Sequence, residues 1–66
     1  MNPTIGFLFD GAATRLAQAG LPEPRRDAAE LVARVLGISR LAVLVSRRDP
    51  APPAAAARLR QFVARR

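Results

Sequence analysis

The sequence predicts an all-α protein, a small orthogonal bundle of four to five short helices. Apolar residues recur at helical spacing in successive segments, and glycines and prolines separate those segments. The apolar residues are mainly Leu, Val, Ile and Ala, with three Phe as the only aromatics, a palette that suits packed helices better than a small sheet. At 66 residues, the chain (residues 1–66) is expected to be a single helical domain.

The first helix is expected to begin near Asn2 or Thr4, because Asn2 before a proline is typical of an N-cap followed by the first helical residue. Gly6 and Gly11 each weaken a helix by roughly 1 kcal/mol relative to Ala, so we expect its first half to fray. Its apolar stripe comprises Ile5, Leu8, Phe9, Ala12 and Leu16.

Two Gly-hydrophobic pairs mark the ends of helices. Gly20 suits the left-handed position just past the first helix, and Leu21 is placed to fold back on Leu16, as in a Schellman motif. Gly37 and Ile38 repeat this ending after the second helix. The chain therefore signals where its first two helices stop.

The second helix is the most clearly predicted element. Pro24 is placed to be its first residue, and Asp27 and Glu30 lie in its early turns, where the helix dipole favours acidic side chains. Glu30 and Arg34 have the spacing of a favourable ion pair. Its apolar face comprises Ala28, Leu31, Val32, Val35 and Leu36.

A third, shorter helix is predicted after Ser39, whose hydroxyl suits an N-cap. Leu41, Leu44 and Val45 are expected on one side of it. The short apolar run at 41–45 also fits a strand by periodicity alone. A lone strand would have no partner elsewhere in the chain, which favours the helix.

The last helix is expected to follow a proline-containing loop at 46–53 and to run from about Pro53 to the end of the chain. The alanines that follow Pro53 are strong helix formers. Leu59, Phe62 and Val63 supply its apolar face.

The residue types needed for catalysis are missing. The chain has no Cys, His or Lys, which excludes disulfides and cysteine nucleophiles and leaves no His or Lys to activate Ser or Thr. Its four glycines are dispersed, so no glycine-rich cofactor loop exists. Asp27 and Glu30 lie one turn apart and could share a metal ion or a proton, but the helix dipole alone explains their positions. We expect no catalytic, cofactor-binding or metal-binding residue, and no enzymatic activity from these residues alone.

The net charge is +6, and every basic residue is Arg. A basic excess favours anionic partners, but a merely solvated surface that reflects an Arg-, Ala- and Pro-rich composition is the preferred interpretation. Nucleic-acid binding is disfavoured because few aromatics are available for stacking, and a helix-turn-helix around Gly37 would have a short, apolar recognition helix. No apolar run approaches the roughly 20 residues that cross a bilayer. We expect a cytoplasmic monomer that has no membrane partner.

The segment from Glu23 to Arg40 reads Glu-Pro-Arg-Arg-Asp-Ala-Ala-Glu-Leu-Val-Ala-Arg-Val-Leu-Gly-Ile-Ser-Arg. It resembles the N-terminal domain of the HemK/PrmC-type peptide chain release factor N5-glutamine methyltransferases, which shows a Pro-Arg-x-Asp-Ala start, an apolar helix ending in Leu-Gly, and then a short helix containing Ser or Arg. The chain departs from the family pattern where Pro52-Pro53 replaces a Thr or Ser cap. The residues that match the motif are Pro24, Arg25, Asp27, Ala28, Leu31, Leu36 and Gly37.

The resemblance implies a parent protein with two parts. A separate Rossmann-like domain would use S-adenosylmethionine to methylate the glutamine of the Gly-Gly-Gln motif in peptide chain release factors. Its Asn-Pro-Pro-Tyr signature and glycine-rich loop do not occur in this chain. The helical domain would help to hold the release factor and would pack on the catalytic domain. The alternatives are a small basic nucleic-acid-binding domain and a purely structural module. The residues expected to contact the partner are Arg25, Arg26, Arg58, Arg65 and Arg66.

Overall fold

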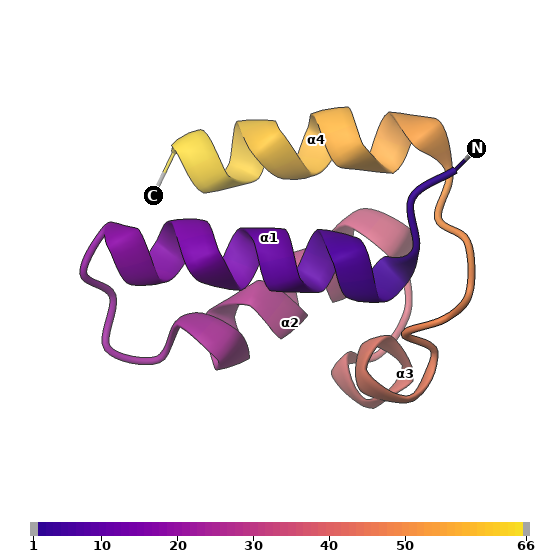
Figure 1. Ribbon diagram of the computed structural model, residues 1–66, viewed down its shortest axis with the longest axis horizontal. Helices are drawn as coiled ribbons and strands as arrows, with labels where there is room; N and C mark the ends of the chain where they lie inside the picture. Colours follow the sequence, from indigo (N-terminus) through magenta and orange to yellow (C-terminus); the bar gives the residue numbers. More distant parts are fainter. Residues whose placement is uncertain (1, 66) are drawn as a thin grey trace.

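The computed structural model describes residues 2–65, which form four α-helices and no strand. They are α1 (Ile5–Gln18), α2 (Pro24–Leu36), α3 (Arg40–Val45) and α4 (Pro53–Ala64). In Figure 1, α1 and α4 lie side by side and run in the same direction, α2 packs on α1, and α3 is viewed nearly along its axis. The predicted all-α bundle is confirmed, with four helices in this part of the chain.

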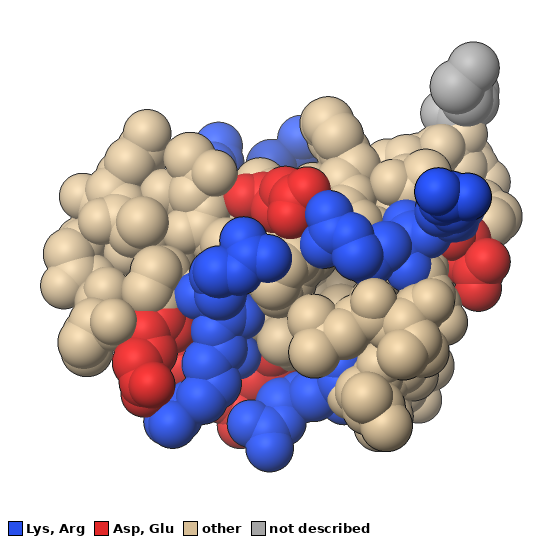
Figure 2. All heavy atoms as spheres, turned by 60° about the horizontal axis from the view of Figure 1, so that its bottom comes forward, with Lys and Arg blue, Asp and Glu red and all other residues tan. Residues whose placement is uncertain are grey.

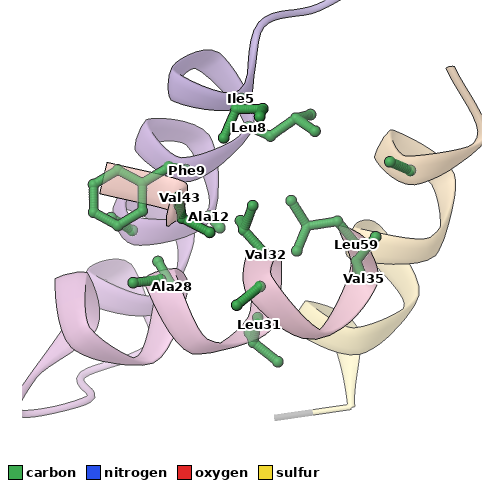
Figure 3. Close-up of a cluster of buried hydrophobic side chains, with 14 of the residues drawn as sticks. Ile5, Leu8, Phe9, Ala12, Ala28, Leu31, Val32, Val35, Val43 and Leu59 are labelled. Carbon is green, nitrogen blue, oxygen red and sulfur yellow. The ribbon is translucent and has the colours of Figure 1, made fainter. Parts of the chain in front are cut away.

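One apolar cluster holds the helices together. The largest side chains with less than 2% exposure are Phe9, Leu16, Val32 and Val43, which come from α1, α2 and α3. Leu59 of α4 is also buried. Figure 3 shows apolar side chains of the four helices meeting in this cluster. The stripe predicted for α1 is entirely buried, which confirms it.

Of the two starts expected for the first helix, Thr4 is confirmed: Thr4 is the N-cap and the helix begins at Ile5. Thr4 has an extended backbone, and its Oγ1 accepts a hydrogen bond from the backbone N–H of Phe7 at 3.0 Å. This hydroxyl satisfies one of the first-turn N–H groups that have no partner within a helix. The cap predicted at Asn2 is therefore wrong.

The loop between α3 and α4 supplies two more partners to the start of α1. The N–H of Ile5 donates to the carbonyl oxygen of Asp49, and the N–H of Gly6 donates to that of Arg47, both at 2.9 Å. A Cβ atom added at Gly6 would lie 3.0 Å from the Arg47 carbonyl oxygen, so the close approach requires glycine. The fraying predicted from Gly6 is wrong, because these amides are hydrogen-bonded to a distant segment.

The end of α1 is a complete Schellman motif, as predicted. Gly20 has a left-handed backbone with φ of 84°. The N–H of Leu21 donates to the Leu16 carbonyl at 3.2 Å, and the N–H of Gly20 donates to the Ala17 carbonyl at 3.0 Å.

The connection from α2 to α3 is also set by local signals. Gly37 is left-handed with φ of 72°, and the N–H groups of Gly37 and Ile38 both donate to the carbonyl of Ala33. The Oγ of Ser39 accepts from the N–H of Ala42 at 3.0 Å, which confirms the predicted N-cap.

The second helix matches its prediction in boundaries and in buried face. Pro24 is its first residue, Asp27 lies in its first turn, and four of the five predicted apolar residues are buried while Leu36 is half-buried. The ion pair expected between Glu30 and Arg34 is not among those formed within residues 2–65.

The apolar residues expected on one side of the third helix face solvent. Val43 is fully buried, whereas Leu41, Leu44 and Val45 are 69%, 47% and 73% exposed. Four of the six residues of α3 are large and apolar, so periodicity could not identify the inward side. The helix predicted after Ser39 is confirmed, and the apolar residues expected on one side of it, Leu41, Leu44 and Val45, are exposed.

The last helix begins at Pro53, as expected, although no side chain caps it. Proline suits the first helical position because the N–H that it lacks would have no partner there. Leu59 is buried, and Phe62 and Val63 are half-buried.

Candidate partner-binding surface

Two arginines cover one aromatic ring near the start of α2. The guanidinium carbon of Arg25 lies 5.0 Å from the centroid of the Phe9 ring, and that of Arg47 lies 5.6 Å from the same centroid. Phe9 itself is only 1% exposed. Cations at this distance are attracted to the face of the ring. The contacts join α1, α2 and the loop after α3 beneath a positively charged surface.

Two ion pairs form within residues 2–65, and both are exposed. Nη1 of Arg26 lies 3.0 Å from Oε2 of Glu23, and Nη2 of Arg47 donates to Oδ2 of Asp10 at 2.8 Å. Exposed pairs contribute little to stability, in the range of about 0–1 kcal/mol. Replacing either carboxylate partner by a carboxylate of another molecule would therefore cost the domain little stability.

A hollow of about 460 Å³ lies between α2 and α3. Four of its lining residues are apolar and three are arginines, and no carboxylate lines it. Figure 2 shows the face that carries α2 and α3, where arginine side chains lie among uncharged areas and acidic side chains. The lining residues are Phe9, Arg25, Arg26, Ala29, Arg40, Leu41 and Leu44.

A second groove, the α1–α4 groove, has an apolar lining and lies on another side of the bundle. It includes Phe7, Gly11 and Val63, together with Arg60. Phe7 is 70% exposed. The α1–α4 groove shares no lining residue with the hollow between α2 and α3.

Neither a metal cluster nor a membrane-spanning helix occurs in the part of the chain that the structure describes. No three His, Cys, Asp or Glu side chains gather there to hold a metal ion. None of the four helices has the length and apolar character needed to cross a bilayer.

Comparison with known proteins identifies the family. Residues 8–66 match the family described as the PrmC N-terminal domain. The chain belongs to this family. The release factor glutamine methyltransferase of Rhodospirillum rubrum is 44% identical over 62 residues, which cover 94% of this chain and 19% of that protein. The chain thus spans about a fifth of the length of this curated relative. No solved structure matches the chain significantly.

In this PrmC N-terminal domain, the family motif lies at structural positions. Pro24 opens α2, Gly37 ends it with a left-handed backbone, and Ala28 and Leu31 are buried. Arg25 is the exception, since it is exposed and lies over Phe9.

The predicted partner residues do not form one surface. Arg25 and Arg26 line the hollow between α2 and α3, whereas Arg58 lines a different depression beside the start of α4. Arg65 is exposed just after α4. Arg66 lies outside the described residues.

Sequence reasoning missed three residues of the hollow: Arg40, Leu41 and Leu44. Leu41 and Leu44 were expected only as the apolar side of a short helix, and Arg40 is not part of an Arg-Arg pair. A signal was present nonetheless, because a six-residue helix makes fewer than two turns and cannot bury four large apolar side chains against one core.

Proposed function

We propose that this chain is the substrate-recognition domain of a release factor glutamine methyltransferase. In this proposal, a separate domain of the parent protein binds S-adenosylmethionine and methylates the glutamine of the Gly-Gly-Gln motif. The 66 residues help to hold the release factor, pack on the catalytic domain and contribute no catalytic group. The site of action is the cytoplasm, and the parent protein is a monomer. Family membership and the name of the Rhodospirillum rubrum relative support this proposal.

The observation that carries the recognition role is the hollow between α2 and α3. Three arginines and exposed leucines share one surface there, beside a core that is already complete without them. Mixed apolar and arginine-rich surfaces are typical of the centres of protein interfaces. Such a surface supports contact with a protein.

Nucleic-acid binding is the second candidate, and the charge of +6 favours it. The hollow argues against it because its one aromatic residue, Phe9, is 1% exposed and already covered by two guanidinium groups. Single-stranded nucleic acids are usually bound by exposed aromatic rings on which bases stack.

The recognition role is tested by titrating the ¹⁵N-labelled chain with the release factor of the same organism and following amide chemical shifts. Recognition predicts saturable shift changes at a contiguous set of residues. An RNA oligonucleotide titrated at low and at moderate salt serves as the comparison, because nucleic-acid binding would weaken steeply with salt. A spectrum unchanged by the release factor at high micromolar concentration would contradict independent recognition.

Removal of this domain from the parent enzyme separates recognition from a purely structural role. Recognition predicts a higher KM for the release factor, with the kcat and the melting temperature of the catalytic domain retained. A structural module predicts the reverse order, with a loss of thermal stability before any change in KM.

A further inference from the structure

Exposed apolar surface is concentrated on one short segment. Of the five large apolar side chains that are exposed within residues 2–65, four lie between Ile38 and Val45, and the fifth is Phe7 of α1. Leu41 and Val45 are each about 70% exposed, at 69% and 73%. Leu41 and Leu44 line the hollow between α2 and α3, whereas Ile38 lines the depression beside the start of α4. Exposed apolar side chains that share one hollow are typical of a site that another molecule covers. Because α3 is anchored by Val43 alone, its leucines are not needed to close the core.

Arginine side chains border this apolar surface on the side that faces α2. Arg25, Arg26 and Arg40 line the same hollow as Leu41 and Leu44, and none of its lining residues is acidic. Arg40 takes part in neither of the two ion pairs of residues 2–65. Guanidinium groups bind carboxylates and phosphates through paired hydrogen bonds, so this border favours anionic groups.

We propose that the α3 surface, defined as Arg25, Arg26, Arg40, Leu41 and Leu44, docks an acidic amphipathic segment of the release factor. An apolar side chain of that segment packs against the two leucines, and neighbouring carboxylates pair with the three arginines. This inference rests on the proposed function, because it takes the release factor as the partner.

Charge complementarity favours an acidic protein segment over a second copy of the chain and over a nucleic acid. A second copy of the chain would bring its own arginines against these, since the chain carries a net charge of +6. A nucleic acid would satisfy the arginines, but Leu41 and Leu44 can neither stack on bases nor hydrogen-bond to them. An acidic protein segment with an apolar face satisfies both halves of the surface.

The test compares two variants of the α3 surface with two matched controls in the α1–α4 groove. Leu41→Asp and Phe7→Asp each introduce a carboxylate at an exposed apolar position in the first turn of a helix, with exposures of 69% and 70%. Arg40→Glu and Arg60→Glu each reverse one exposed arginine. Binding of the release factor to the 66-residue chain is measured by isothermal titration calorimetry.

Leu41→Asp and Arg40→Glu are each expected to raise the Kd by about tenfold or more, as for substitutions at an interface centre. Phe7→Asp and Arg60→Glu are expected to leave the Kd within about twofold, as for surface positions away from the contact. Circular dichroism of each variant reports its helical content and melting. If Leu41→Asp unfolds the chain, the pair Arg40→Glu and Arg60→Glu decides the outcome.

The outcomes separate this inference from the proposed function. If both α3 variants bind the release factor as the wild type does, but Phe7→Asp or Arg60→Glu does not, the proposed role of the α3 surface is overturned. The recognition role of the domain then remains. Absence of release-factor binding by the wild-type chain overturns both. If nuclease treatment abolishes the binding, a nucleic acid is the partner, and the proposed role of the α3 surface is overturned.

Discussion

The pair α1–α2 and the short helix α3 use the same kinds of residue for different purposes. In α1 and α2 the apolar stripe faces inward, and nearly all of it is buried. In α3, Val43 is the one buried residue, while Leu41, Leu44 and Val45 face solvent. The difference indicates that stability is concentrated in the long helices, whereas α3 presents apolar groups that the domain does not use internally. Substitutions in the two regions should therefore separate stability from binding.

The largest effect is expected from Leu16→Ala in α1. Leu16 is 0% exposed, so truncation removes buried methyl groups and leaves a cavity. We expect a loss of about 2–5 kcal/mol in the free energy of unfolding, enough to unfold most of a domain this small. Urea denaturation followed by circular dichroism measures it. A loss well below this range would show that the core of α1 is loosely packed and would weaken the contrast with α3.

The second effect is expected from Gly6→Ala. The new Cβ would lie 3.0 Å from the Arg47 carbonyl oxygen, so the loop must move away and strain its hydrogen bond to α1. We expect destabilisation of about 1–3 kcal/mol, as for other overpacked sites.

Gly11→Ala is the matched control for this substitution. A Cβ at Gly11 meets no atom within 4 Å, so the better helix propensity of Ala should stabilise the protein by up to about 1 kcal/mol. Thermal melting of both variants gives the sign of each change. Equal stabilisation by the two alanines would mean that the loop does not dock on the start of α1.

A smaller effect is expected from Ser39→Ala at the start of α3. The substitution removes the acceptor for the Ala42 N–H and should cost about 1 kcal/mol. Ser39→Asp retains a capping oxygen and should stay close to the wild type. Since α3 carries the exposed leucines, the alanine variant should also weaken release-factor binding, which calorimetry would detect. A binding loss with Ser39→Asp as large as with Ser39→Ala would rule out capping as the cause.

The smallest change in stability is expected from Leu41→Ser. Because the side chain is 69% exposed, its removal should alter the free energy of unfolding by less than about 0.5 kcal/mol. The same urea denaturation used for Leu16→Ala measures it. Destabilisation comparable to that of Leu16→Ala would place Leu41 in the core and remove the distinction between the two regions.

The parts of the fold that the sequence predicted depend on neighbouring residues. A left-handed glycine followed by an apolar residue ends α1 and α2, and Ser39 caps α3, because each signal is read within a few residues of the chain. The stripes of α1 and α2 were predicted because more than three turns of periodicity define one face.

The missed features depend on segments far apart in the chain. Gly6 is needed because the Arg47 carbonyl approaches it, and nothing near Gly6 in the sequence indicates this. Which face of α3 is buried depends on how the connection between α2 and α3 orients this six-residue helix. Of the candidate surface, Arg25 and Arg26 were predicted because they lie in the segment that resembles the family, whereas Leu41 was expected only as part of the apolar side of a short helix.

The hydrogen bonds from Ile5 and Gly6 to the loop after α3 also bear on the order in which the domain forms. During synthesis, the residues of α1 are made long before Arg47 and Asp49. The N–H groups of Ile5 and Gly6 therefore have no hydrogen-bond acceptor in this loop until the second half of the chain has been made. The first turn of α1 should therefore become protected from hydrogen exchange late, together with the docking of the loop, although it is the first part of the helix to be made.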